Sequence, residues 1–155
     1  VVKNRYYWHD IIGYNYRMTN ICAAIGLGQL KKAKDILRKK REVFRLYKLF
    51  LNDLDIKMNK ELKNSKSSFW LINIFLKNKK SRDNLAKYLK TNKVETRNTF
   101  NPVHKMPMYK KNNKNKKFLN AQHLSDTGLS LPSGPSLKAN QIKNVCNLIR
   151  NYLKR

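Results

Sequence analysis

Acidic side chains are scarce in this chain of 155 residues, which has 9 Asp and Glu against 35 Lys and Arg and a net charge of +26. Such an excess of positive charge first suggests a nucleic-acid partner. The lysines, however, occur on nearly every segment and are mixed with asparagine, whereas a nucleic-acid footprint needs clustered charge. We therefore favour a solvated basic surface, and keep a basic RNA- or DNA-binding module as the less supported alternative.

Cysteine is also rare, and the two present, Cys22 and Cys146, stand far apart without C-x-x-C spacing. Each falls in an apolar helical pattern, so we expect two small buried hydrophobic residues with neither a disulfide nor a metal site. The sequence contains no recognisable Ser-His-Asp, Cys-His or zinc-binding spacing and no glycine-rich phosphate loop. These absences exclude the common self-contained catalytic motifs.

Long apolar runs are missing as well. No segment approaches the roughly twenty apolar residues of a membrane span. The first ten residues, VVKNRYYWHD, are aromatic and charged and do not resemble a signal peptide. We expect a cytoplasmic protein without a membrane partner. Because a long motif begins only a few residues after Val1, we expect the chain to be a piece of a longer protein.

Helical periodicity is clear in three parts of the chain. Residues 19–30 form a first predicted helix, with Thr19 or Asn20 as its cap. Residues 31–54 continue or restart it, with apolar residues at helical spacing on one side and the run Arg38–Arg41 on the other. Residues 139–153 carry an apolar stripe typical of a final helix. A further helix is expected at 81–90, capped by Ser81, and a shorter one at 118–126.

Strand-like segments alternate with the later helices. The apolar, aromatic run FWLINIFL at 69–76 favours a buried strand. Residues 94–100 alternate in polarity, and residues 129–131 form a third short strand, whereas residues 57–68 read as a polar connector. The fold class predicted is α+β, with long helices leading into a small sheet covered on one face by helices.

One stretch, His9 to Gln29, organises the rest: HDIIGYNYRMTNICAAIGLGQ. An extended loop with an amide, two phenols and a guanidinium leads into a helix rich in Ala and Gly, which lets another backbone approach closely. A phosphate is bound well by fixed N–H donors and a guanidinium fork, and Asn15 and Arg17 offer both. The alternative from the residues alone is an asparagine turn beside a solvent-exposed arginine.

This stretch resembles the segment that follows the cofactor-lysine region in the DegT/StrS-type sugar-nucleotide aminotransferases. Two later segments, 94–109 and 128–137, match the same family in the same order. The resemblance covers most of the chain but not the family's N-terminal half. It implies the C-terminal part of the fold-type-I, pyridoxal-phosphate-dependent aminotransferase fold with a small antiparallel sheet. Residues 1–54 would be the end of the large domain, the interface loop and connecting helices, and residues 55–155 the small C-terminal domain.

The resemblance also implies roles for individual residues. Asn15 and Arg17 would reach across a homodimer interface to the partner's cofactor phosphate, with Tyr14 and Tyr16 shaping the wall of the substrate site. Arg97, in the sequence E-T-R-N, and His104, after Asn101-Pro102, would lie on the substrate side. Asn98 replaces the family's proline, and an ion pair of Arg97 with Glu95 is an equally good interpretation.

The lysine that forms the Schiff base with the cofactor lies, in the family, before the start of this chain. Pyridoxal phosphate chemistry needs that amine. The chain is therefore expected to be inactive alone and to work with the missing N-terminal half, transferring an amino group, with glutamate as donor, to a nucleotide-linked keto sugar for cell-surface polysaccharide or lipopolysaccharide. The alternative within this family is an inactive remnant.

Overall fold

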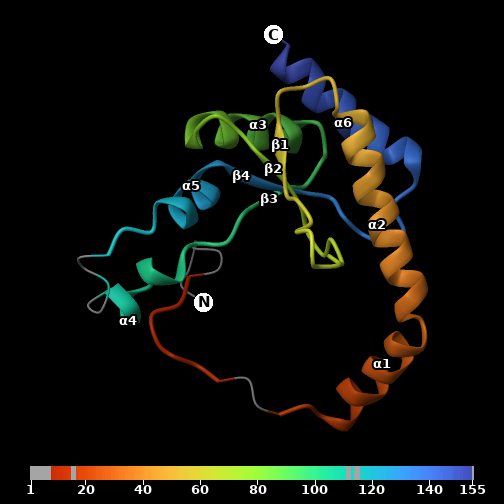
Figure 1. Cartoon of the computed structure of the whole chain (residues 1–155), viewed down its shortest axis with the longest axis vertical. Coiled ribbons are helices and arrows are strands. Elements are labelled where there is room, and N and C mark those ends of the chain that lie inside the picture. Colours follow the sequence, from red (N-terminus) through yellow and green to blue (C-terminus); the bar gives the residue numbers. More distant parts are fainter. Residues whose placement is uncertain (1–7, 15–16, 111–112, 114–115, 155) are drawn as a thin grey trace.

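The computed structural model describes residues 8–14, 17–110, 113 and 116–154. Two helices, α1 and α2, come first, and four short strands alternate with further helices behind them (Figure 1). The elements are α1 (Asn20–Lys31), α2 (Ala33–Phe50), β1 (Lys57–Met58), β2 (Ile72–Phe75), α3 (Lys79–Thr91), β3 (Arg97–Asn98), the 3-10 helix η1 (Val103–Lys105), α4 (Pro107–Lys110), α5 (Leu119–Thr127), β4 (Gly128–Leu131) and α6 (Ala139–Leu153).

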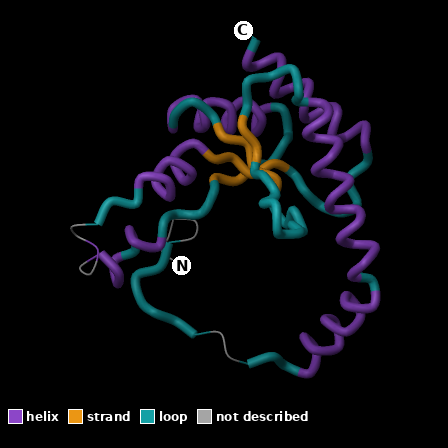
Figure 2. The backbone as a smooth tube through the Cα atoms, in the orientation of Figure 1, coloured by secondary structure: helices purple, strands orange, loops and turns teal. Residues whose placement is uncertain are grey.

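The four strands form one antiparallel sheet in the order β1-β2-β4-β3 (Figure 2). In the central pair, Ile72 lies opposite Leu131 and Ile74 opposite Leu129. The predicted α+β class with a small antiparallel sheet is confirmed. The prediction of residues 57–68 as a connector without a strand was wrong, because β1 pairs along the β2 edge. A strand of two residues has no periodicity that a sequence can display.

Helices α2, α3 and α6 pack against one face of the sheet (Figure 1). That face presents Ile72, Ile74, Leu129 and Leu131, all of which are buried. The helices contribute the largest share of the core, as expected for an amphipathic stripe that packs on a sheet. The fully buried helical side chains are Tyr47 of α2, Leu85 and Leu89 of α3, and Ile142, Cys146 and Ile149 of α6.

The basic run Arg38–Arg41 does not lie wholly on the wet side of α2, contrary to the prediction. Lys40 is only 9% exposed and belongs to the buried face of the helix, three residues before Val43 and seven before Tyr47. Its ammonium donates hydrogen bonds to the main-chain carbonyls of Trp70, at 2.6 Å, and of Ser133. Lysine is rarely buried without partners for its charge, and here two carbonyl oxygens supply them.

The observed N-cap residue is the predicted one in α1 and a different one in α3. Thr19 caps α1 by accepting a hydrogen bond from the Cys22 amide, at 3.3 Å, as predicted. The cap of α3 is Asn78 and not Ser81, because the Ser81 amide donates to Asn78 Oδ1 at 2.8 Å. Both residue types are good caps, so composition alone does not choose between neighbours.

Helix α1 contains no buried residue and lies away from the sheet (Figure 1). The prediction that Cys22 is buried was wrong for this chain, since its side chain is exposed, whereas the prediction for Cys146 is confirmed. Within the described ranges, no helix is both long and apolar enough to cross a membrane. The division into units 1–54 and 55–155 stays a prediction, and α2 shares its core with the sheet.

Candidate functional site

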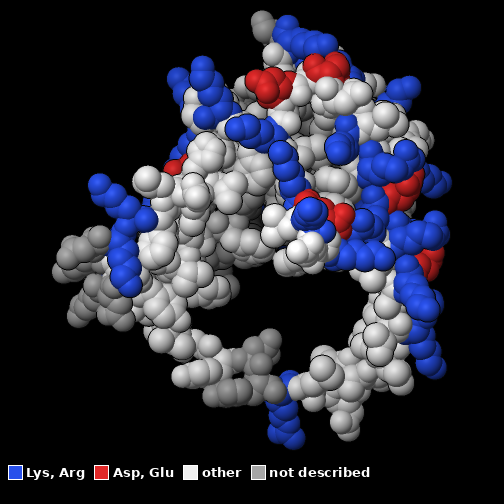
Figure 3. Space-filling model, viewed as in Figure 1, with Lys and Arg blue, Asp and Glu red and all other residues white. Residues whose placement is uncertain are grey.

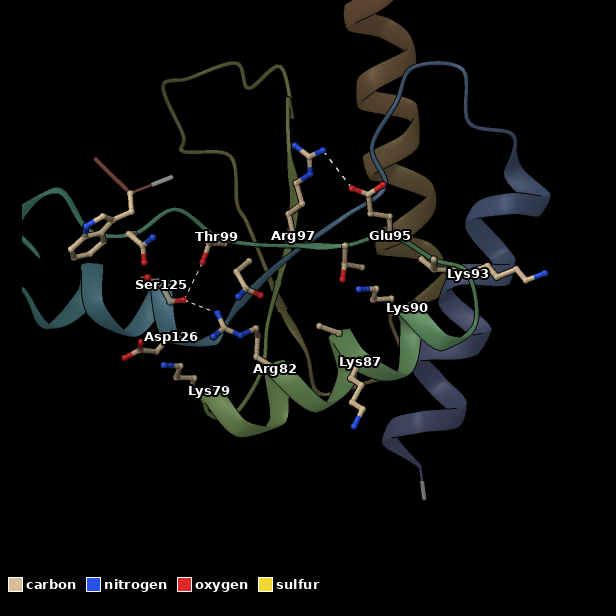
Figure 4. A pocket seen from close by; sticks show the side chains of 16 residues that line it. Lys79, Arg82, Lys87, Lys90, Lys93, Glu95, Arg97, Thr99, Ser125 and Asp126 are labelled. Carbon is tan, nitrogen blue, oxygen red and sulfur yellow. Dashed lines mark hydrogen bonds and ion pairs between the residues drawn. The ribbon is translucent and has the colours of Figure 1, made fainter. Parts of the chain in front are cut away.

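A large hollow lies between helix α3 and the segment around strand β3 (Figure 4). Its volume is about 1220 Å³, comparable to or larger than that of most ligand sites. The lining comes mostly from two stretches that are close in sequence, residues 79–93 and 94–101, with Ser125 and Asp126 of α5 closing one end. Trp8 also lines the hollow. The N-terminal segment therefore lies beside the end of β3, which is about ninety residues further along the chain.

Positive charge dominates this hollow. The two acidic side chains that line it are Glu95 and Asp126. The basic ones that line it are Lys79, Arg82, Lys87, Lys90, Lys93 and Arg97. Elsewhere on the visible face, Lys and Arg are spread widely and lie beside the few Asp and Glu, as the sequence distribution indicates (Figure 3). The excess of cations in a concave place favours an anionic ligand.

Arg82 is the buried member of this set, at 4% exposure. Its guanidinium donates to Asp83 Oδ1 at 2.6 Å and to the Ser125 carbonyl at 3.0 Å. Thr99 donates to the Leu124 carbonyl at 2.9 Å and more weakly to Ser125, as the dashed lines of Figure 4 partly show. The Thr99 bonds tie the end of β3 to α5, and the Arg82 bond to Ser125 ties α5 to α3. The charge of Arg82 is therefore largely used within the fold.

Arg97, predicted on the substrate side, is an exposed residue of β3 that lines the hollow. Its guanidinium lies 3.5 Å from Glu95 Oε1, which is the ion pair that the sequence left open as the alternative. Both side chains are largely exposed, so this pair contributes little to stability and leaves the guanidinium accessible. The predicted role of Arg97 toward a substrate stays a prediction.

His104, the other predicted substrate residue, lies on η1 and is half-buried. Its imidazole stacks on the Phe118 ring with centroids 4.6 Å apart, which fixes the ring plane. Residues 102–106 form a tight turn in which the amides of Lys105 and Met106 bond to the carbonyls of Pro102 and Val103. The strand-to-turn position predicted for His104 therefore exists, and its contact with a substrate remains a prediction.

The loop before α1 is described only in part. Tyr14 and Arg17 are exposed, with Arg17 two residues before the cap Thr19. Asn15 and Tyr16, which the sequence places in the cofactor and substrate sites, lie outside the described residues. The structure thus brings Trp8 and Arg97 to one hollow, while His104 and Arg17 lie on separate segments. The predicted role of Asn15 and Arg17 in binding the cofactor phosphate therefore stays a prediction.

Two further features were not predicted from the sequence. One is the burial of Lys40, which its helical spacing from Val43 and Tyr47 could have indicated. The other is an exposed aromatic pair, in which the Trp70 and Phe100 rings stack with centroids 6.2 Å apart. The sequence predicts a buried run at 69–76, but Trp70 is exposed, whereas Phe69 before it is buried and Leu71 after it is half-buried.

Comparison with known proteins gives a consistent result. The chain matches the DegT/DnrJ/EryC1/StrS aminotransferase family over residues 1–150. It is 44% identical over 149 residues to the GDP-perosamine synthase of Escherichia coli O157:H7, and 40% identical over 154 residues to that of Vibrio cholerae. These alignments cover 96% and 98% of this chain but 40% and 42% of the relatives. The chain therefore spans about 40% of the length of these relatives.

Solved structures agree at the level of the fold. Streptomyces venezuelae DesV in complex with a ketimine intermediate superposes with a TM-score of 0.81, at 23% identity over 99% of this chain and 41% of that one. Helicobacter pylori PseC, an aminotransferase of pseudoaminic acid biosynthesis, gives 0.79 at 22% identity over 93% of this chain and 40% of that one. On the family match and the two perosamine synthase relatives, this chain belongs to the DegT/DnrJ/EryC1/StrS aminotransferase family.

Proposed function

We propose that this chain is the C-terminal part of a pyridoxal-phosphate-dependent aminotransferase acting on a nucleotide-linked keto sugar. The amino donor would be glutamate, and the aminated sugar would serve a cell-surface polysaccharide or lipopolysaccharide. The observation that supports this best is the 44% identity to a GDP-perosamine synthase, which extends over nearly the whole chain. A cytoplasmic location and a homodimer with shared sites are part of the same proposal.

The residues present fit one part of the cofactor, its phosphate. Arg17 is exposed, pairs with no described carboxylate, and has the planar fork that binds a phosphate in two places. Asn15 would add an amide donor two residues earlier. Bound pyridoxal phosphate supplies the electron sink for amino-group transfer. Arg17 and Asn15 would orient it, and Tyr14 and Tyr16 would limit the access of water.

The described lysines do not include a good candidate for the covalent cofactor lysine. Lys40 is the one whose pKa burial lowers, the property such an amine needs. Its Nζ, however, donates to the Trp70 and Ser133 carbonyls and lines no part of the hollow. The amine is therefore held in a structural role. This supports the part of the proposal that the chain needs a complementary polypeptide for activity.

The experiment is reconstitution. The chain is co-expressed with the segment of the Escherichia coli O157:H7 GDP-perosamine synthase that it does not cover, and the complex is purified. Release of 2-oxoglutarate from glutamate is then measured with a nucleotide-linked keto sugar as acceptor. We expect turnover by the complex and none by the chain alone. A stable complex that holds pyridoxal phosphate yet shows no turnover would identify an inactive remnant.

Covalent attachment provides a second measurement. Each polypeptide is incubated with pyridoxal phosphate, reduced with borohydride and examined by mass spectrometry. We expect stoichiometric labelling at one lysine of the complementary segment and only scattered, substoichiometric labelling of this chain. Specific labelling of a single lysine in this chain would overturn the assignment of the covalent lysine to the missing part.

A further inference from the structure

The exposed pair Trp70–Phe100 is unusual for a small domain. Trp70 is 66% and Phe100 46% exposed, although large aromatic side chains normally bury most of their surface. Their rings stack, with centroids 6.2 Å apart and planes 24° from parallel. Phe69, the preceding residue, turns the opposite way and stacks on Phe44 of α2 at 3.7 Å. The chain therefore directs one aromatic ring into the core and presents the next one outward.

The pair links two strands that are not neighbours in the sheet. Strands β2 and β3 both pair antiparallel with β4, which lies between them. Trp70 precedes β2 and Phe100 follows β3, so the contact between their rings joins the two outer partners of β4. The helices pack on the sheet face that carries Leu129 and Leu131.

The other face is polar. Arg97 lies opposite Ser130 in the register of β3 and β4, and Ser130 lies opposite Asn73 in that of β4 and β2. The Ser130 hydroxyl donates to Asn73 Oδ1 at 2.6 Å, so the Asn73 oxygen is used and its amide nitrogen is the group that can donate to a ligand. In Figure 4 the Arg97 side chain points away from α3. A guanidinium and an amide thus lie in one row on the sheet face opposite the core.

The main chain beneath the pair is held firmly. The Lys40 ammonium bonds to the Trp70 carbonyl, and Thr99, next to Phe100, is tied to the α5 carbonyls. Side chains that are exposed on a rigid backbone are preorganised for a ligand, because ordering them adds little entropy cost on binding. Aromatic platforms beside a cation are typical of sites that bind a base and its phosphate.

We propose that the Trp70–Phe100 pair lies over the polar sheet face and stacks the base of a nucleoside diphosphate, whose phosphates bind at Arg97 and Asn73. This inference rests on the proposed function, since it assigns the nucleotide part of the nucleotide-linked sugar to this sheet face. The same chemistry, an aromatic base with phosphates, also occurs in a single nucleic-acid strand. The experiment therefore includes both sources.

The test uses the full chain with Trp8→Phe, so that Trp70 is the only tryptophan. Guanosine diphosphate is titrated at about 0.15 M salt, and the fluorescence of Trp70 is followed. We expect saturable quenching that inorganic diphosphate does not reproduce. Phe100→Ala should raise the Kd roughly 5- to 150-fold, the range that one stacking contact supplies. Arg97→Gln should also raise the Kd, whereas Lys143→Gln, which removes an exposed cation of α6 that does not line the hollow, should not.

Two further variants in the natural sequence, measured by calorimetry, separate stacking from folding. Trp70→Phe should keep most of the affinity and Trp70→Ala should lose it, with both variants retaining the unfolding midpoint. Equal affinity of Trp70→Ala and the natural chain would overturn the proposal. So would tighter binding of a short single-stranded oligothymidylate than of guanosine diphosphate, which would instead assign the face to nucleic acid.

Failure here is distinguishable from failure of the proposed function. If the reconstituted complex is inactive while guanosine diphosphate still binds at Trp70, the site stands and the aminotransferase assignment falls. If the complex is active and Trp70→Ala changes neither its KM for the nucleotide-linked sugar nor its affinity for guanosine diphosphate, the site falls and the function stands.

Discussion

The Lys40 ammonium lies 2.6 Å from the main-chain carbonyl oxygen of Trp70, and this bond links helix α2 to the entrance of strand β2. The same ammonium bonds to the Ser133 carbonyl just after β4, so one side chain joins three segments of the core. Burial lowers the pKa of Lys40, since the charged form loses water. The two carbonyls offset that loss.

Lys40→Met should therefore destabilise the fold. It keeps the apolar stem but removes the donor of two part-buried carbonyls, and an unsatisfied group of this kind costs about 1–3 kcal/mol. The free energy of unfolding from urea titration measures the loss. Lys39→Met is the matched control, because Lys39 is exposed and its ion pair with Asp35 lies on the surface, and it should change stability by less than about 1 kcal/mol. Similar losses in both variants would show that the Lys40 bonds are not stabilising.

Gly128→Ala should destabilise the junction of α5 and β4. A Cβ at Gly128 would overlap the Thr99 side chain and lie 2.6 Å from the Leu124 carbonyl oxygen. Overpacking of this kind costs about 1–3 kcal/mol. At Gly134 the nearest atom to an added Cβ is 3.9 Å away, so Gly134→Ala should leave the unfolding midpoint nearly unchanged. Thermal unfolding of both variants compares their midpoints directly. An unchanged midpoint for Gly128→Ala would mean that Thr99 and Leu124 can move apart to accept the added methyl group without loss of stability.

Alkaline pH should destabilise the chain through Cys146. Burial raises the pKa of its thiol from 9.0 to about 12. Between these values the unfolded chain releases a proton that the folded chain keeps, so the free energy of unfolding falls as pH rises. At pH 11 the loss should be about 2–3 kcal/mol. Burial also raises the pKa of Tyr47, which adds to the effect, while the lowered pKa of Lys40 opposes it.

The contribution of Cys146 is isolated by comparing the pH profiles of Cys146→Ala and Cys22→Ala. The exposed Cys22 serves as the control, and its variant should keep the natural decline in stability between pH 8 and pH 11. Cys146→Ala should be less stable at pH 8 because of the cavity, yet lose less stability on going to pH 11. Parallel profiles would contradict a titrating thiol in the core.

The exposed apolar side chains of α1 should cause self-association. Ile21, Ile25, Leu27 and Leu30 are each more than half exposed on one short helix. These side chains are spread around the helix, and this much exposed apolar surface is normally covered in a soluble protein. Sedimentation velocity at moderate salt should show oligomers that the double variant Ile21→Lys and Ile25→Lys reduces. Leu119→Lys, at an equally exposed position on α5, should not reduce them. A cleanly monomeric natural chain would refute this expectation.

The loop before α1 is tested in the reconstituted complex. Arg17→Ala should weaken binding of pyridoxal phosphate or the nucleotide-linked sugar strongly, because a charge-assisted contact contributes roughly 1.5–3 kcal/mol. Arg17→Lys should restore only part of it, since lysine keeps the charge but lacks the planar fork. Asn15→Ala should mainly weaken retention of the cofactor. Equilibrium dialysis of the cofactor measures each variant.

Action in trans makes a separate prediction. When complexes with Arg17→Ala are mixed with complexes whose complementary segment lacks the covalent lysine, each mixed dimer should hold one intact site. Some activity should therefore return. If mixed dimers form and no activity is recovered, the loop acts within its own subunit or only supports the structure.

Sequence patterns determined much of this protein. The stripe of α6, the burial of Cys146, the cap Thr19 and the order of the longer helices and strands, β1 excepted, follow from periodicity and capping chemistry, which are local properties. Burial of Lys40 and exposure of Trp70 are not local properties. Lys40 lies on the core side of α2 only because two carbonyls from the sheet approach it, and Trp70 faces outward only because Phe69 takes the place beside Phe44.

The site divides in the same way. The loop residues, Arg97 and His104 could be predicted as site residues, because each lies in a contiguous sequence motif that resembles the family. The row Arg97, Ser130 and Asn73 joins three strands far apart in sequence, and the register of the sheet alone brings it together. The pair Trp70 and Phe100 likewise joins two segments that are far apart in sequence. Register depends on which faces are buried, so only the tertiary structure could decide which side chains share the polar face.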